Sequence, residues 1–180
     1  MQLISNQMRR FILLSILSFL ALLSFSQEAR IFSSYNTSGS YKGDCLYIIE
    51  DHKIFDSYNS SGSYKGECKL IFENERIYQS YNSSGSYKGD CLFIFEDGKL
   101  FKSYNTSGSY KGDCIFIVDD GKIFDSYNTS GSYKGDCRYI LEEDKVYKSY
   151  NSSGSYKGDC ILILEGEVGI IQILGILATL

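Results

Sequence analysis

Two kinds of apolar segment alternate between residues 30 and 165 of this sequence. The shorter kind carries two adjacent apolar residues, as at Ile54 and Phe55, and the longer kind carries three around an invariant Ile, as at Ile48. Both are rich in β-branched and aromatic residues, and stretches of Ser, Asn, Asp and Gly separate them. Neither has the period of an amphipathic helix, so the pattern predicts short β-strands joined by turns.

The two segments belong to one unit that occurs six times without insertion or deletion. The unit reads Ser-Tyr-Asn-(Ser/Thr)-Ser-Gly-Ser-Tyr-Lys-Gly-(Asp/Glu)-Cys and starts every 23 residues, at Ser34, Ser57, Ser80, Ser103, Ser126 and Ser149. A period of this length is the signature of a repeat architecture in which every unit has an equivalent environment.

Each unit predicts one β-hairpin. In the first unit the expected strands are residues 30–36 and 41–50, and the turn between them contains Gly39, which is free to take a positive φ. A tight acidic turn, such as Asp97-Gly98, leads to the next unit. The six units therefore predict a meander of about twelve short antiparallel strands.

Both strands of a unit are apolar at neighbouring positions, which indicates that both faces of the sheet are covered. An open sheet would also leave two exposed edges, which favour aggregation, whereas a closed ring has no edge. We therefore expect an all-β antiparallel meander closed into a symmetric shallow barrel. The alternative is an open single-layer hairpin sheet.

Residues 1–27 have the features of a secretory signal peptide. Arg9 and Arg10 precede an apolar run of about 15 residues, shorter than the roughly 20 that span a bilayer as a helix. We expect cleavage near Gln27 and a secreted or periplasmic protein, with an uncleaved N-terminal anchor as the alternative. The six repeats then form one hairpin domain at residues 28–166.

The apolar C-terminal tail, residues 167–180, breaks the period and carries no charge after Glu167. Three interpretations stay open. The tail plugs or caps the ring, it binds an interface or a partner, or it results from a reading-frame change that truncated a longer array.

The repeat also resembles two known families. The segment from Asp120 to Gly135 is similar to the repeat of the β-flower families. These are small bacterial proteins built from hairpins whose sequence is roughly Gly-x-Ile-Tyr-Asp…Gly-x-x-x-Gly. That resemblance implies a shallow, rotationally symmetric barrel and assigns no activity. The segment from Gly89 to Leu100 is similar to the MORN-type repeat, but Cys91 stands where that family usually has Trp. The MORN resemblance implies an open sheet that contacts membranes or proteins.

Composition excludes several classes of function. The formal net charge is −4, so the chain lacks the basic footprint of a nucleic-acid-binding protein. His52 is its one histidine, and no nucleophile elbow, P-loop or dinucleotide fingerprint is present. We therefore expect no enzyme activity, no catalytic residue and no cofactor.

Two tyrosines flank the Asn-(Ser/Thr)-Ser-Gly-Ser turn of every unit. A tyrosine ring offers a flat apolar face and a polar hydroxyl, so the repeated pair is a candidate rim for binding a glycan or a peptide. The alternative is that the rings pack across strands. The candidate residues are Tyr35, Tyr41, Tyr58, Tyr64, Tyr81, Tyr87, Tyr104, Tyr110, Tyr127, Tyr133, Tyr150 and Tyr156.

The cysteines and the carboxylates before them repeat with the same period. Equivalent cysteines of adjacent hairpins lie two strands apart, about 9.6 Å, which exceeds the roughly 7 Å between the Cα atoms of a disulfide. Buried thiols, disulfides across a narrow axis and a ring for a soft metal stay open. For the carboxylates we expect pairing with the lysine two residues earlier, with a cation site as the alternative. The residues are Cys45, Cys68, Cys91, Cys114, Cys137 and Cys160, and Asp44, Glu67, Asp90, Asp113, Asp136 and Asp159.

The sequence as a whole favours an exported, non-catalytic β-repeat protein that acts as a binding or structural module. It does not identify the ligand. The alternatives are a membrane-associated module that uses the apolar tail and a metal-binding protein that uses the ring of cysteines.

Overall fold

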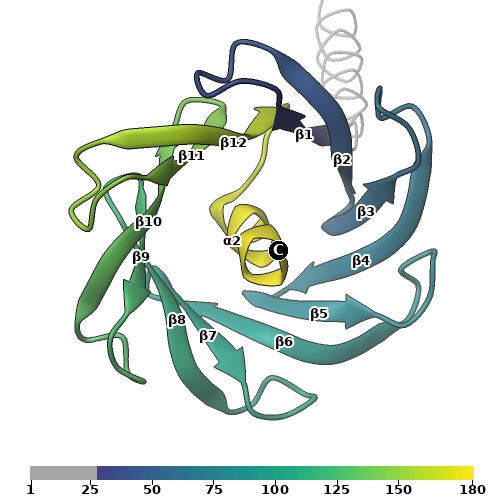
Figure 1. Ribbon diagram of the computed structural model, residues 1–180. Coiled ribbons are helices and arrows are strands. Elements are labelled where there is room, and N and C mark those ends of the chain that lie inside the picture. The colour runs from purple at the N-terminus through teal and green to yellow at the C-terminus, as the bar shows by residue number, and fades with distance from the viewer. Residues whose placement is uncertain (1–27) are drawn as a thin grey trace, which may run out of the picture.

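The computed structural model describes residues 28–180, so the expected signal peptide at residues 1–27 lies outside the described residues. The described chain forms twelve strands followed by one helix, α2 (Ile170–Thr179). Figure 1 shows the strands as a ring with α2 inside it.

Every repeat contributes one short and one long strand, as the sequence predicts. The expected strands extend further than the observed ones, because the tyrosines and asparagines belong to the loops. The short strands are β1 (Ala29–Ser34), β3 (Lys53–Ser57), β5 (Arg76–Ser80), β7 (Lys99–Ser103), β9 (Lys122–Ser126) and β11 (Lys145–Ser149). The long strands are β2 (Lys42–Glu50), β4 (Lys65–Glu73), β6 (Lys88–Glu96), β8 (Lys111–Asp119), β10 (Lys134–Glu142) and β12 (Lys157–Glu165).

The sheet is closed. Each strand pairs with its neighbours in sequence, and β1 also pairs antiparallel with β12, from Arg30 opposite Glu165 to Ser33 opposite Leu162. The predicted closed meander is therefore confirmed, and the alternative of an open single-layer sheet is wrong. Closure pairs the backbone groups that two sheet edges would otherwise expose.

A bulge in every long strand determines which residues face outward. In the pairing of β1 with β2, Tyr47 and Cys45 lie opposite consecutive residues of β1, which leaves Leu46 without a partner. The same shift recurs in the other units. Strict alternation would place Cys45 and Ile48 on opposite faces, but the extra residue places both in one outer cluster.

The lumen of the barrel is filled by α2. About eight strands enclose a space that side chains alone can fill, and twelve enclose more, which leaves room for a helix about 10–12 Å wide. Leu174 and Ile176 are 0% and 1% exposed and pack against the inward residues of the short strands, such as Ile77. A Cβ placed on Gly175 would lie 3.2 Å from Ile77 and Phe72, so this glycine lets the helix approach the wall closely. Of the three interpretations of the tail, the structure shows the plug.

The outer face is covered by the long loops, each of which folds back over the preceding unit. The backbone N–H of Cys45 donates to the carbonyl of Ser60 at 2.9 Å. A Cβ placed on Gly62, whose φ is +73°, would lie 2.7 Å from the sulfur of Cys45. The N–H of Cys160 donates to the carbonyl of Thr37 at 2.9 Å, so the first loop covers the last unit. The overlapping loops therefore form a complete ring around the barrel.

Candidate functional site

Each long loop is fixed by hydrogen bonds from one asparagine. The Oδ1 atom of Asn59 accepts from the backbone N–H groups of Ser63 at 2.9 Å and Tyr64 at 3.3 Å, and its Nδ2 donates to the hydroxyl of Ser61 at 2.9 Å. The backbone N–H of Tyr58 donates to the carbonyl of Tyr64 at 3.0 Å and closes the loop. In the other loops the asparagine likewise accepts from the N–H of the second tyrosine and donates to the serine hydroxyl two residues later. The asparagine side chains are therefore occupied within the loops.

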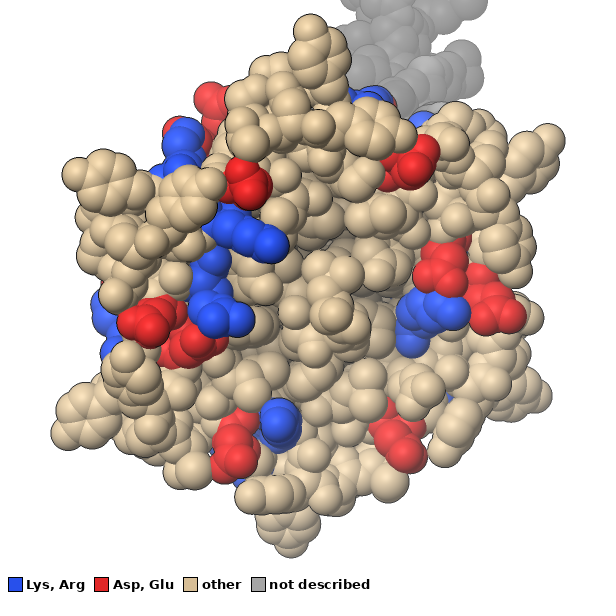
Figure 2. Space-filling view, viewed as in Figure 1, with Lys and Arg blue, Asp and Glu red and all other residues tan. Residues whose placement is uncertain are grey.

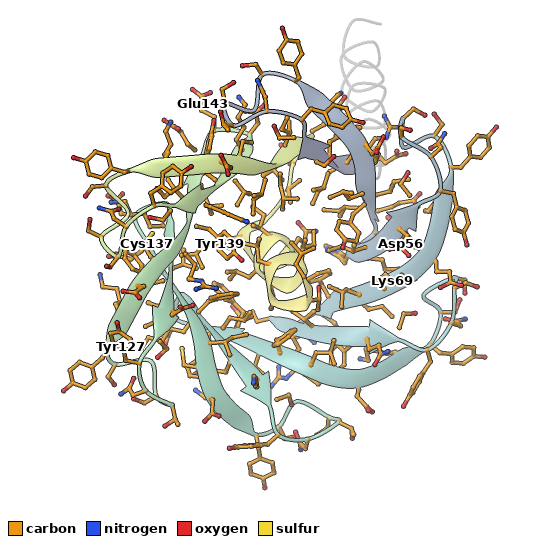
Figure 3. The ribbon with its side chains drawn as sticks, in the orientation of Figure 1. Asp56, Lys69, Tyr127, Cys137, Tyr139 and Glu143 are labelled. Carbon is orange, nitrogen blue, oxygen red and sulfur yellow. The ribbon has the colours of Figure 1, made fainter. Side chains whose placement is uncertain are left out.

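The two tyrosines of each loop point into solvent. All twelve are 69–74% exposed, and we call them the tyrosine rim. In Figure 3 Tyr127 points away from the barrel wall, whereas Tyr139 lies on the lumen side. The alternative that the rim tyrosines pack across strands is correct for the first tyrosine of the loop. A Cβ placed on Gly66 of β4 would lie 3.2 Å from the ring of Tyr58, although Tyr58 is still 70% exposed. Whether the rim binds a ligand stays a prediction.

The lysine at the start of each long strand does not pair with the nearby carboxylate, so that prediction is wrong. Instead Lys65 crosses the ring of Phe55, with Nζ 4.5 Å from the ring centroid, and forms an ion pair with Glu50 of the preceding unit. All six lysines make the equivalent contacts, and Lys42 closes the series with Glu165. The strand direction carries each Nζ away from the loop and toward this second carboxylate.

The carboxylates beside the tyrosine rim are consequently not paired with these lysines. Within residues 28–180, Glu67 pairs with Lys69 at 3.3 Å, and none of the five aspartates has an ion-pair partner. The hydroxyl of Tyr127 donates to Oδ1 of Asp136 at 3.4 Å, and Tyr81 and Asp90 make the same contact at 3.4 Å. We call the six residues Asp44, Glu67, Asp90, Asp113, Asp136 and Asp159 the rim carboxylates.

A groove opens between a rim carboxylate and the first tyrosine of the next unit. Between β10 and β11 it has a volume of about 510 Å³ and is lined by Asp136, Arg138, Lys148, Tyr150 and other residues of the two strands. A second groove, between β6 and β7, has a volume of about 420 Å³ and is lined by the residues at the equivalent positions. Both grooves are shallow and open to solvent. The sequence did not reveal these grooves, because each is built from two adjacent units.

The six cysteines are free and buried. They lie on the outer face under the loop glycines, not on the barrel axis, so disulfides across the axis are excluded. Burial raises the pKa of Cys45, Cys68, Cys91, Cys114 and Cys160 above the ordinary value of 9.0. Within the described residues no three His, Cys, Asp or Glu side chains are grouped closely enough to hold a metal ion.

The end of the barrel that carries the long loops has charges of both signs around the C-terminal end of α2. Lys69 forms an ion pair with Asp56 at 2.8 Å, and Arg138 lies 3.7 Å from Asp125. Figure 2 shows acidic and basic side chains interspersed over this face. Burial raises the pKa of Asp125. The face therefore has no strong charge of one sign to attract a polyanion or a polycation.

These features define a closed barrel of six hairpin repeats with a helix in its lumen and an aromatic rim outside. Comparison with known proteins finds no matching family model, no similar curated protein and no similar solved structure. In residues 28–180, no helix combines the length and the apolar character that crossing a bilayer requires.

Proposed function

We propose that this protein is an exported, non-catalytic binding module that presents six equivalent loops to a partner with repeated features. The observation that carries the proposal is the exposure of twelve tyrosines on six fixed loops. Exposed tyrosines lose little conformational freedom on binding and supply both contact area and a hydrogen bond. Six linked sites also bind a repetitive partner far more tightly than one site does.

The fold supports this role. Because the barrel is closed, its wall is rigid, and the loops are held at fixed positions around it by the asparagine bonds. The closed hairpin barrel agrees with the resemblance to the β-flower families, which implies a symmetric scaffold with no assigned activity. Export and signal-peptide cleavage near Gln27 remain part of the proposal.

The two alternative functions have less support. A membrane role for the tail would require α2 to leave the lumen, where Leu174 and Ile176 are almost fully buried. A metal-binding ring of cysteines would require thiols that face one another, whereas each thiol lies separately under the loop of the following unit.

The test uses a variant with the first tyrosine of every loop changed to serine. This rim-serine variant carries Tyr35→Ser, Tyr58→Ser, Tyr81→Ser, Tyr104→Ser, Tyr127→Ser and Tyr150→Ser. The wild-type protein and the variant are passed over immobilised polysaccharides, a random peptide library and vesicles of phosphatidylcholine and phosphatidylglycerol. We expect wild-type binding to one class and its loss in the variant, with unchanged circular dichroism. No binding to any class, or full binding by the folded variant, would refute the proposal.

A further inference from the structure

The grooves beside the tyrosine rim recur in the structure. The β10/β11 groove and the β6/β7 groove are lined by the same nine positions, two units apart. Asp136 and Tyr150 of the first correspond to Asp90 and Tyr104 of the second. A pocket that recurs with the repeat is a property of the unit and not an accident of local packing.

We infer that these grooves bind the sugar units of a neutral glycan chain. This inference rests on the proposed function and specifies its ligand. In the β10/β11 groove, Asp136 accepts the hydroxyl of Tyr127 through Oδ1 and has further lone pairs free, because a carboxylate accepts up to about four hydrogen bonds. A carboxylate that only accepts needs a ligand that donates, and sugar hydroxyls are donors.

The tyrosines complete a site of this chemistry. Tyr127 contacts the carboxylate from its own unit, and Tyr150 of the next unit lines the groove on the other side. An exposed aromatic ring packs against the C–H groups on one face of a sugar ring, while its hydroxyl bonds to the sugar's polar edge. Tyr150 and Asp136 line the same groove, so an aromatic face beside a carboxylate matches a ring that is apolar on its faces and polar at its edge.

Charge favours a neutral ligand. Arg138 is paired with Asp125, and Asp136 and Lys148 carry opposite charges, so the groove has no net charge that would attract a polyanion or a polycation. The β6/β7 groove also combines an aspartate with a lysine, Lys102. Uncharged hydroxyl groups interact favourably with both signs.

The architecture also argues against a peptide ligand. Peptides commonly bind by adding a strand to a free sheet edge, and the closed barrel has no free edge in its described strands. The loop asparagines, which would otherwise bond a peptide backbone, are already occupied by the loop itself.

The test compares two variants that each lose six negative charges. The rim-amide variant carries Asp44→Asn, Glu67→Gln, Asp90→Asn, Asp113→Asn, Asp136→Asn and Asp159→Asn. The matched control changes six carboxylates at the opposite end, none of which has an ion-pair partner within residues 28–180. It carries Asp51→Asn, Glu75→Gln, Asp97→Asn, Asp120→Asn, Glu143→Gln and Glu167→Gln.

Affinity is measured by calorimetry for a soluble α-glucan, β-glucan, mannan and xylan, beside a polyuronate and a sulfated glycan. We expect at least one neutral polysaccharide to bind the wild-type protein. Its affinity for the rim-amide variant should be about tenfold or more lower, and its affinity for the control variant should be unchanged. Preference for an anionic glycan, or equal affinity of both variants, would overturn the inference.

The outcomes also separate the two proposals. Binding of a peptide or an anionic glycan that is lost in the rim-serine variant would overturn the neutral-glycan inference and leave the binding module standing. Absence of binding to every probe would overturn both.

Discussion

The filled lumen predicts that a single buried side chain of the tail contributes a large part of the stability. Leu174 is 0% exposed and packs within the central cluster. Its truncation in Leu174→Ala removes buried methyl groups and leaves a cavity, which costs about 3–5 kcal/mol. That is a large fraction of the roughly 5–15 kcal/mol by which domains are stable. For a chain of this size the melting temperature should fall by about 6–20 °C.

The residue that follows the helix provides a matched control. Leu180 is 70% exposed, so Leu180→Ala should change the free energy of unfolding by no more than about 0.5 kcal/mol. Urea unfolding of both variants and the wild-type protein, followed by far-UV circular dichroism, gives the three midpoints. Equal midpoints for Leu174→Ala and Leu180→Ala would show that the helix does not occupy the lumen and would refute the packing described above.

Two further predictions concern the loops and the thiols under them. Gly62→Ala should destabilise the folded protein more than Gly98→Ala. Both glycines have a φ above +70°, so the backbone strain is similar. The new Cβ at Gly62 would lie 2.7 Å from a sulfur, whereas the nearest atom to a Cβ at Gly98 is 3.5 Å away. Equal urea midpoints for the two would contradict the close packing of the loop on Cys45. Burial raises the pKa of Cys45 above 9.0, so the unfolded chain loses its thiol proton first as pH rises. The protonated thiols therefore stabilise the folded state fully below about pH 8.5 and progressively less above it. Between about pH 8 and pH 10, the urea midpoint should fall more for the wild-type protein than for a variant with all six cysteines changed to alanine. Equal falls in the two proteins would contradict this reasoning.

The local sequence was sufficient to predict the hairpins and their closure. The Asp97-Gly98 turn and the alternating apolar segments specify antiparallel neighbours, and closure follows because exposed edges are unfavourable. The bulge at Leu46 could not be read from the sequence, because this position is apolar in four units and charged in the other two, at Lys69 and Arg138, and so does not specify a register. The tail is apolar at almost every position, and such a run has no periodicity that separates helix from strand.

The tyrosine rim was predicted as one of two alternatives, and the choice depended on tertiary structure. Tyr58 and Tyr64 flank a turn, and aromatic residues there can pack across strands or point outward. Both occur together at Tyr58, whose ring lies beside Gly66 of the next strand and is still 70% exposed. The loop that carries it is positioned by contact of Gly62 with the thiol of the preceding unit, and that contact joins two repeats. The partner of Lys65 was predicted wrongly for the same reason, because Glu50 lies in the neighbouring unit. Repeats this similar give no sequence signal that shows which unit contacts which.

The helix in the lumen fits a barrel with one particular number of hairpin repeats. Tandem repeats this alike readily gain or lose a copy, and the circumference of a barrel grows with its number of strands. A chain with seven hairpins would close around a space too wide for α2, and one with five would leave no room for it. Packing against α2 therefore favours six copies of the hairpin, although α2 itself carries no copy of the repeat.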